Sequence, residues 1–317
     1  MNILETVVLW TLHLAGLLFW PLVLVGVIRR AKALLTCRRG PPILQPVRDI
    51  AKLLRKREVL ADTTTWVFAV TPWVSFAVVV VVGLMVPLAT GRTPLAGRAD
   101  LILLVYLFAL DRFFRTVAAM DTGTAFGGLG ASRESFVSTL AEPALVLSLW
   151  CVGILTGSLD LGEMVCRFAG LAQLVLSPVY LLVLLPLVLV ALAENCRIPF
   201  DDPTTHLELT MIHEAMSLEY SGRGLALMEW ASMMRVGIWL ALIANLFFPA
   251  GLADEVLTPH LLVGLASFAL RTVVLAVGVA LVEVTFARLN FFRIPDLLGL
   301  AVASAVLALI RIVTLGR

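Results

Sequence analysis

Charged residues and cysteines are both scarce in this chain. Asp, Glu, Lys and Arg make up 15% of its 317 residues, whereas soluble domains carry about 25%. The four cysteines are scattered, without a CxxC pair, at Cys37, Cys151, Cys166 and Cys196. Because an iron–sulfur cluster needs several thiolates brought together, we expect any redox centre to lie on another chain. The sequence predicts no cofactor and no metal ion bound by this chain.

Several catalytic and transport signatures are also missing. The glycine-rich stretch 121–134 has neither a preceding strand nor the spacing of a nucleotide-binding loop. A zinc-protease motif that began at His213 would need a second histidine at position 217, where the chain has Ser217. No internal repeat stands out, which disfavours an inverted-repeat transporter. The alternating short segments of a membrane barrel are absent from the sequence.

Long apolar runs dominate the chain instead. Hydrophobic residues make up 60% of it, and the mean hydropathy is +1.00. Runs of about 20 apolar residues can cross a hydrocarbon core about 30 Å thick. We therefore predict an all-α, polytopic helical membrane protein, with residues 1–317 forming a single integral membrane domain in the lipid bilayer. The eight predicted spans are about 3–28, 66–89, 100–119, 135–156, 171–193, 225–249, 261–286 and 297–314.

The distribution of positive charge predicts the orientation. The net charge is +2, and ten of the 24 Lys and Arg residues fall between Arg29 and Arg57. Because basic loops stay in the cytoplasm, this cluster indicates topology rather than nucleic-acid binding, and both termini are predicted outside. Residues 50–57 suit a surface helix that contacts either lipid headgroups or a partner. The predicted cytoplasmic loops are 29–65, 120–134, 194–224 and 287–296.

A few polar groups lie within the predicted spans. Asp111 and Arg115 are four residues apart, so we expect them to pair on one helix face. Glu142 stands just before a proline, and a carboxylate at membrane depth is a candidate functional group because it is costly to keep there. Arg271 must face a polar interior or an acidic partner for the same reason. His13 is expected to hydrogen-bond to a neighbouring helix.

The segment 194–235 interrupts the apolar pattern with acidic groups. Its seven carboxylates are Glu194, Asp201, Asp202, Glu208, Glu214, Glu219 and Glu229. Two prolines disfavour helix near 199–203, and a helix is predicted over about 206–219, ended by the glycines at 222 and 224. His206 and His213 share a face of that helix, but their spacing alone does not indicate a metal site. A long acidic loop between spans indicates docking or proton movement.

Three motifs resemble those of one family. In the first loop the matching residues are Arg39-Gly40-Pro41, Leu44-Gln45-Pro46, Asp49 and Lys52-Leu53. Around the fourth span they are Gly130 to Glu134 and Glu142-Pro143. In the acidic segment they are Glu194, Arg197, Pro199-Phe200-Asp201, Pro203, Glu208-Leu209 and Glu219 to Gly222. The chain thus resembles the membrane-anchoring subunit of respiratory complex I (the mitochondrial subunit 1 family), and more closely its counterpart in membrane-bound nickel–iron hydrogenases and formate hydrogenlyases.

The resemblance implies a non-catalytic subunit that docks a soluble redox arm and links it to H⁺ or Na⁺ translocation. It implies hydrogenase-like large and small (iron–sulfur) subunits and antiporter-like membrane subunits as partners. The absence of a transit peptide and the abundant arginine predict a bacterial or archaeal cell membrane. The proton-relay or coupling candidates are Asp111, Glu142, Glu194, Glu208, Glu214, Glu219, Glu229 and Glu283. The candidates for loop bracing and partner docking are Arg39, Gln45, Asp49, Lys52, Arg133, Arg197, Asp201, Asp202, His206 and His213.

Three alternatives to this function stay open. In the first alternative, the chain forms part of a quinone pocket. Against this alternative, Thr204 and His206 stand where the quinone-reducing branch of the family usually has acidic residues, which favours the hydrogenase branch. In the second, the chain only anchors the soluble arm and its intramembrane charges are structural ion pairs. In the third, it is a stand-alone ion transporter, which would require the isolated chain to catalyse flux.

Overall fold

The computed structural model describes residues 3–61, 63–170, 177–201, 211–249 and 260–315, and its regular elements there are all helices. They are α1 (Ile3–Leu35), α2 (Gln45–Leu54), α3 (Trp66–Met85), α4 (Leu101–Asp121), α5 (Ala125–Thr156), α6 (Leu161–Ala169), α7 (Pro178–Glu194), α8 (His213–Ser217), α9 (Gly222–Phe247), α10 (His260–Thr285), the 3₁₀ turn η2 (Phe291–Arg293) and α11 (Ile294–Leu315). The predicted all-α class is confirmed.

Six helices among the described residues are long and apolar enough to cross a membrane: α1, α3, α5, α9, α10 and α11 with η2. Each of the eight predicted spans falls on a helix, but two of these helices do not meet that standard. The described part of α7 has 17 residues, and α4 carries Asp111, Arg112 and Arg115 in its apolar stretch. A multi-pass helical membrane protein is therefore confirmed, while the number eight stays a prediction.

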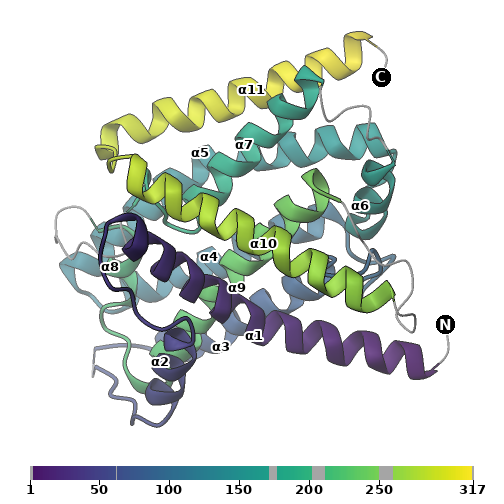
Figure 1. Ribbon diagram of the computed structural model, residues 1–317. Helices are drawn as coiled ribbons and strands as arrows, with labels where there is room; N and C mark the ends of the chain where they lie inside the picture. Colours follow the sequence, from purple (N-terminus) through teal and green to yellow (C-terminus); the bar gives the residue numbers. More distant parts are fainter. Residues whose placement is uncertain (1–2, 62, 171–176, 202–210, 250–259, 316–317) are drawn as a thin grey trace.

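The two ends of the bundle differ. The start of α1, the end of α11 and helix α6 lie at one end, and α2 and α8 lie at the other (Figure 1). The basic segment around α2 is thus at the opposite end from both termini. This arrangement agrees with termini on a shared side of the membrane; which side that is stays a prediction.

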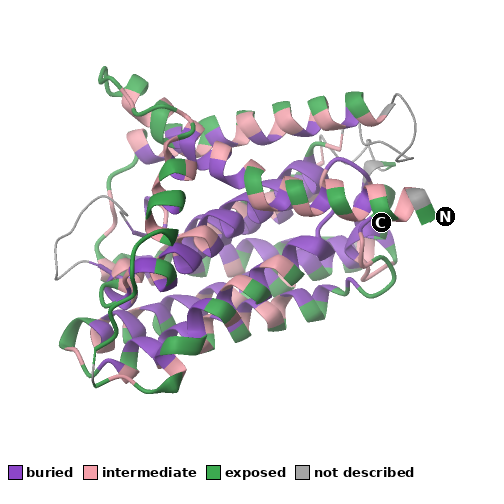
Figure 2. Cartoon of the chain, turned by 90° about the horizontal axis from the view of Figure 1, so that it is seen from below, coloured by how far each residue is buried: buried purple, intermediate pink, exposed green. Residues whose placement is uncertain are grey.

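Helix α9 forms the centre of the bundle. Nearly all of its positions after Ala231 are buried, and its Trp239 stacks on Phe108 of α4 with ring centroids 5.7 Å apart. Buried positions follow the inner helices, and exposed ones follow the outer faces (Figure 2). Many exposed positions are large and apolar, including Trp66 and Trp73 of α3. In a bilayer this surface faces lipid, so its exposure carries no hydrophobic penalty.

Several helix boundaries differ from the predicted spans. Helix α5 begins at Ala125, where the Thr124 side chain accepts a hydrogen bond from Gly127 N, so the predicted loop 120–134 is mostly helical. Helix α1 continues to Leu35, through the start of the predicted loop 29–65. Helix α6 lies between the predicted spans 135–156 and 171–193, where no helix was predicted, and is capped by Asp160. Hydropathy reports the apolar length of a segment, whereas backbone hydrogen bonding continues wherever side chains tolerate helix.

The acidic segment also differs from the prediction. Helix α8 covers only His213–Ser217, and the predicted helix start near residue 206 lies outside the described residues. Gly222 and Gly224 begin α9 rather than end a helix. Gly222 has φ +50°, and a Cβ there would lie 2.5 Å from the Arg57 carbonyl oxygen. Glycine therefore allows the start of α9 to touch the chain that follows α2.

The predicted surface helix is displaced toward the N-terminus. Helix α2 spans Gln45–Leu54, not 50–57, and it begins with Pro46 in its first turn, where proline is well tolerated. It buries Pro46 and Ile50 against the end of the bundle. Its basic side chains at Arg48 and Lys52 are exposed.

The close approach of the 39–44 turn to α1 gives a stability prediction. A Cβ on Gly26 would lie 1.8 Å from the backbone oxygen of Ile43, so Gly26→Ala must push this turn away. We expect a loss of about 1–3 kcal/mol, measured as a lower Tm of the purified chain in detergent. Gly278→Ala, on the outer face of α10 with no atom nearby to meet its Cβ, is the control and should leave Tm unchanged. Equal effects of the two variants would contradict this packing.

Candidate functional site

A cavity of about 640 Å³ lies at the end of the bundle that carries α2 and α8. The C-terminal half of α1, the chain after α7, helix α8 and the first half of α9 form its walls. Charged and polar groups gather on these walls: Arg29, Lys32, Arg38, Arg115, Arg197, Asp201, His213, Glu214, Glu229 and Glu283. Ligand pockets are typically about 300–1,000 Å³, so the cavity is large enough for a small molecule or an ordered water cluster.

Glu283 of α10 pairs with two cations at the cavity wall. Its Oε1 lies 3.1 Å from Arg197 Nη1, and its Oε2 lies 3.3 Å from Lys32 Nζ. The carboxylate side chain is only 2% exposed. A buried carboxylate is tolerated when paired in this way, and the pairs join α1, α10 and the chain after α7.

Arg112 of α4 holds two further carboxylates. Its Nη2 lies 2.8 Å from Glu194 Oε1 at the end of α7, and its Nη1 forms an ion pair with Glu142 of α5. The guanidinium fork presents several donors in fixed directions, so one arginine can bind two acids at once. This shared arginine connects the C-terminal end of α7 to the middle of α5.

A third ion-pair group surrounds Asp111 of α4. The predicted pair with Arg115 is confirmed at 3.9 Å. Arg235 of α9 lies closer, with Nη2 2.9 Å from Asp111 Oδ2. All three side chains are buried. The Asp111–Arg235 pair was not predicted, because the i, i+4 spacing applies only within one helix and this contact joins two helices.

Asp201 organises the chain on both sides of the segment 202–210. Its Oδ1 lies 2.9 Å from Arg288 Nη2, and its Oδ2 accepts hydrogen bonds from the backbone N–H groups of Ile212 and His213 at 3.2 and 3.4 Å. The Leu289 N–H also donates to the Pro199 carbonyl at 2.9 Å. These bonds tie the acidic segment to the turn before α11, as the bracing role predicted for Asp201 requires.

The other predicted residues separate into several groups. Glu214 and Glu229 face the cavity, whereas Glu219 is exposed outside it. Arg39 and Lys52 are exposed. The remaining candidates Asp202, His206 and Glu208 lie outside the residues that the structure describes.

Gln45, Asp49 and Arg133 make local contacts at the same end. Gln45 Nε2 donates to Asp49 Oδ1 at 2.8 Å, and Asp49 Oδ2 lies 3.6 Å from Arg29 Nη1. Arg133 Nη1 donates to the Met211 carbonyl at 3.0 Å, and its guanidinium lies 5.7 Å from the Phe291 ring centroid. Arg133 therefore ties α5 to the chain before α8 and to η2.

Glu134 is a buried acid that was not among the predicted coupling residues. In the sequence it was visible only as the last residue of a family motif, because its depth depends on how α5 packs against α8. Donor atoms of Glu134, Cys196 and His213 all lie within 4.8 Å of one another. Burial, and then the positive charges of Arg115 and Arg235, lower the pKa of His213 well below its usual value. Burial, and then the nearby carboxylates, raise the pKa of the Cys196 thiol.

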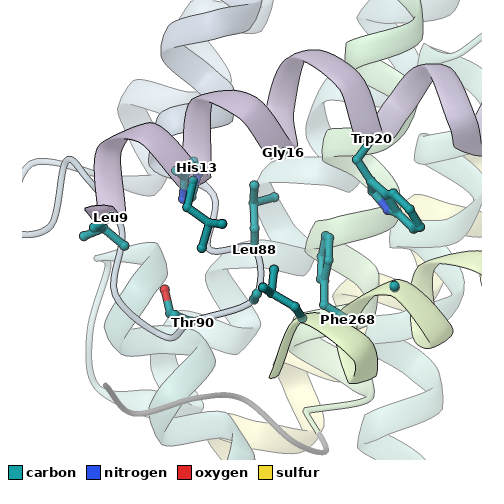
Figure 3. A pocket seen from close by; sticks show the side chains of 11 residues that line it. Leu9, His13, Gly16, Trp20, Leu88, Thr90 and Phe268 are labelled. Atoms are coloured by element: carbon teal, nitrogen blue, oxygen red, sulfur yellow. The ribbon is translucent and has the colours of Figure 1, made fainter. Parts of the chain in front are cut away.

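A second, apolar pocket of about 250 Å³ lies between α1, the chain after α3 and α10 (Figure 3). Leu9, Leu88 and Phe268 project into it, with His13 and Thr90 among its few polar lining groups. The predicted hydrogen bond of His13 to a neighbouring helix is confirmed: its Nε2 lies 3.0 Å from the Gly83 carbonyl of α3. The pocket therefore offers apolar contact and little acid–base chemistry.

Comparisons with known proteins agree with this architecture. The sequence profile of the NADH dehydrogenase family matches residues 8–315. Hydrogenase-4 component C of Escherichia coli is 36% identical over 89% of this chain and 88% of that protein. Formate hydrogenlyase subunit 4 of Escherichia coli is 34% identical over 90% of this chain and 92% of that protein. A subunit of the NADH-quinone oxidoreductase of Rubrobacter xylanophilus is 31% identical over 69% of this chain and 67% of that protein.

A solved structure shows the same fold. A chain of the membrane-bound sulfane sulfur reductase, an archaeal respiratory membrane complex, matches with a TM-score of 0.79 and 19% identity over 94% of this chain and 97% of that one. Fold and relatives together define a multi-pass membrane subunit of a complex-I-like oxidoreductase complex. The chain belongs to the NADH dehydrogenase family, to which the membrane-anchoring subunit of complex I also belongs.

The shared arginine gives a prediction that separates buried from exposed ion pairs. Arg112→Gln leaves Glu194, whose side chain is 7% exposed, without its cation. Breaking a buried pair costs about 3–5 kcal/mol, and we expect a correspondingly large fall in the Tm of the purified chain. Adding Glu194→Gln to this variant should recover part of the loss, because the unpaired charge is then gone.

Glu163→Gln is the matched control. It breaks an ion pair with Arg167, 3.0 Å apart, whose side chains are both more than half exposed. Such pairs contribute about 0–1 kcal/mol, so Tm should change little. A fall as large as that of Arg112→Gln would show that burial is not what makes the inner pair important.

Proposed function

We propose that this chain is the non-catalytic membrane anchor and coupling subunit of a complex-I-like hydrogenase or formate hydrogenlyase. In this role it docks the soluble redox arm and links its electron transfer to the translocation of H⁺ or Na⁺. The proposal rests on two groups of ion pairs, one of Glu283 at the cavity wall and one of Arg112 within the bundle. The similarity to hydrogenase-4 component C and formate hydrogenlyase subunit 4 supports this branch of the family.

The end of the bundle that carries α2 and α8 is the proposed docking surface. Arg38 and Arg39 are exposed there, together with Lys52 on the outer face of α2. This basic surface adjoins the cavity, whose wall includes Arg38. Hydrogenase-like large and small (iron–sulfur) subunits bound at this position would cover the cavity mouth. A charge change in the soluble arm would then act on the cavity groups through a medium of low dielectric constant.

The ion pairs supply the proposed coupling route. Glu283 and Glu229 lie at the cavity, whereas Glu142 lies along α5, and Arg112 connects Glu142 to Glu194. An ion pair can be closed or open, and the addition of a proton or a cation shifts the balance between these two arrangements. A coupling element needs two such states. No iron–sulfur ligand set is required of this chain, because electrons stay in the soluble arm.

The exposure of Glu142 supports the proposal that an antiporter-like membrane subunit binds this chain. Its side chain is 40% exposed on this chain although the helix α5 is a candidate span. A carboxylate facing lipid at this depth costs about 2.5–3.5 kcal/mol. We infer that a neighbouring membrane subunit covers this face of α5 and offers Glu142 a polar continuation of the route.

Glu142→Gln tests the coupling role. The neutral amide keeps the size of the side chain and can still accept a hydrogen bond from Arg112, so the complex should assemble. We expect its redox rate to stay within about twofold, while ion translocation in proteoliposomes falls at least about tenfold. The measurement is ion uptake and redox turnover in the same vesicles.

Glu163→Gln, in the exposed pair at the other end of the bundle, is the control and should leave both rates unchanged. Normal translocation by Glu142→Gln would show that Glu142 is structural. Failure of that variant to assemble would instead favour a chain that only anchors the soluble arm.

A quinone pocket is the second candidate function, and the cavity is the observation that favours it. Beside its charged groups, the cavity wall includes Val25, Ile28, Met233 and Val236, which provide the apolar contact that a quinone ring and tail need. A quinone-site inhibitor that slows the assembled complex would favour this function. An inhibitor without effect would leave the hydrogenase-type function as the better account.

A further inference from the structure

Three metal-ligating side chains from three different elements meet beside the cavity. Glu134 comes from α5, Cys196 from the turn after α7, and His213 from the first residue of α8. Their donor atoms lie within 4.8 Å of one another; Glu134 and Cys196 are buried and His213 is half-buried. The sequence positions are too far apart to show this grouping, which depends on how α5, α7 and α8 pack.

The backbone at Cys196 is unusual for a cysteine. Helix α7 ends with the Arg197 N–H donating to the Leu192 carbonyl at 2.9 Å, and Cys196 has φ +49°. Glycine normally occupies such a left-handed position after a helix, and a side chain there costs about 1–2 kcal/mol. A cysteine in this position directs its thiol toward Glu134 and His213. We infer that the interactions of this thiol offset the conformational cost of the left-handed backbone.

We propose that Glu134, Cys196 and His213 bind a divalent transition-metal ion of the zinc class. Tetrahedral bonds of about 2.0–2.3 Å place ligand atoms about 3.3–3.8 Å apart, so small rotations of the three side chains complete the site. One sulfur, one nitrogen and one oxygen donor suit Zn²⁺ and disfavour Mg²⁺ and Ca²⁺, which prefer oxygen alone.

The cavity supplies an entry path and a fourth coordination position. Cys196 and His213 both line it, whereas Glu134 stands behind them. An ion can therefore reach the three donors from the cavity, and a water molecule can occupy the remaining position. Three protein ligands with an open fourth position are a common zinc arrangement.

The guanidinium of Arg115 must leave the His213 ring before an ion can bind there, and Asp111 is the partner toward which it can move. Arg115 now contacts the His213 ring. Asp111 lies 3.9 Å from Arg115, and its Oδ1 is buried without a hydrogen-bond partner among the described residues. Arg115 already pairs with Asp111, so a rotation that shortens this pair would move the guanidinium away from His213 and free the ring nitrogen. Metal binding would therefore clamp α5, α8 and the end of α7 while it shifts Arg115.

Cobalt provides the direct test, because Co²⁺ takes zinc sites and absorbs light when bound to thiolate. The full chain is purified alone in detergent, cleared of metal with EDTA and titrated with Co²⁺. We expect one Co²⁺ per chain with a thiolate-to-cobalt charge-transfer band in the near ultraviolet, which added Zn²⁺ abolishes. Cys196→Ser should remove the band, and Glu134→Gln and His213→Gln should each weaken binding at least about tenfold.

The other cysteines are matched controls. Cys37→Ser and Cys166→Ser remove exposed thiols, and Cys151→Ser removes a buried one elsewhere; all three should keep the band. The wild-type titration does not depend on how any variant folds. Absence of the band in the wild-type chain, its survival in Cys196→Ser, or its loss in Cys37→Ser or Cys166→Ser would overturn the proposal. None of these results depends on the partner subunits, so they leave the coupling role to its own test.

Discussion

The sharing of Arg112 between two carboxylates is the interaction on which the interior of this protein depends. The bundle is apolar enough to dissolve in lipid, and a charged group inside it is tolerated when it is paired. Arg112 binds Glu142 and Glu194, and Glu283 binds Arg197 and Lys32. These pairs connect α1, α4, α5, α7 and α10, so the same contacts that make the charges tolerable also hold the helices in register.

Ion pairs of this kind can change between two arrangements within a membrane subunit. A cavity of about 640 Å³ brings the pairs of Glu283 within reach of groups outside the bundle, while the exposed apolar faces of α10 and α11 fix the protein in lipid. A pair that is stable in two protonation states at membrane depth can pass on a change made at the docking surface. The proposed metal site lies between the cavity and these pairs, and it acts on the position of Arg115.

The sequence predicted the helices well and the tertiary contacts poorly, for a physical reason. Apolar length is a local property, so every predicted span falls on a helix. The Asp111–Arg115 pair was also predictable, because both residues lie on one helix. The contact between Asp111 and Arg235, and the depth of Glu134, arise from packing between helices, and a single sequence has no signal for them. The start of α5 at Ala125 was missed because its first turns are rich in glycine, which is disfavoured in helices and common in loops.

Arg112→Lys shows most directly whether Arg112 transmits a change between its two carboxylates. This substitution keeps the positive charge, but an ammonium group lacks the planar fork that reaches both acids. In vesicles that contain the assembled complex, we expect redox turnover to continue while the number of ions moved per turnover falls steeply. An unchanged ratio would exclude this role of Arg112 and would leave the ion pairs with a stabilising role alone.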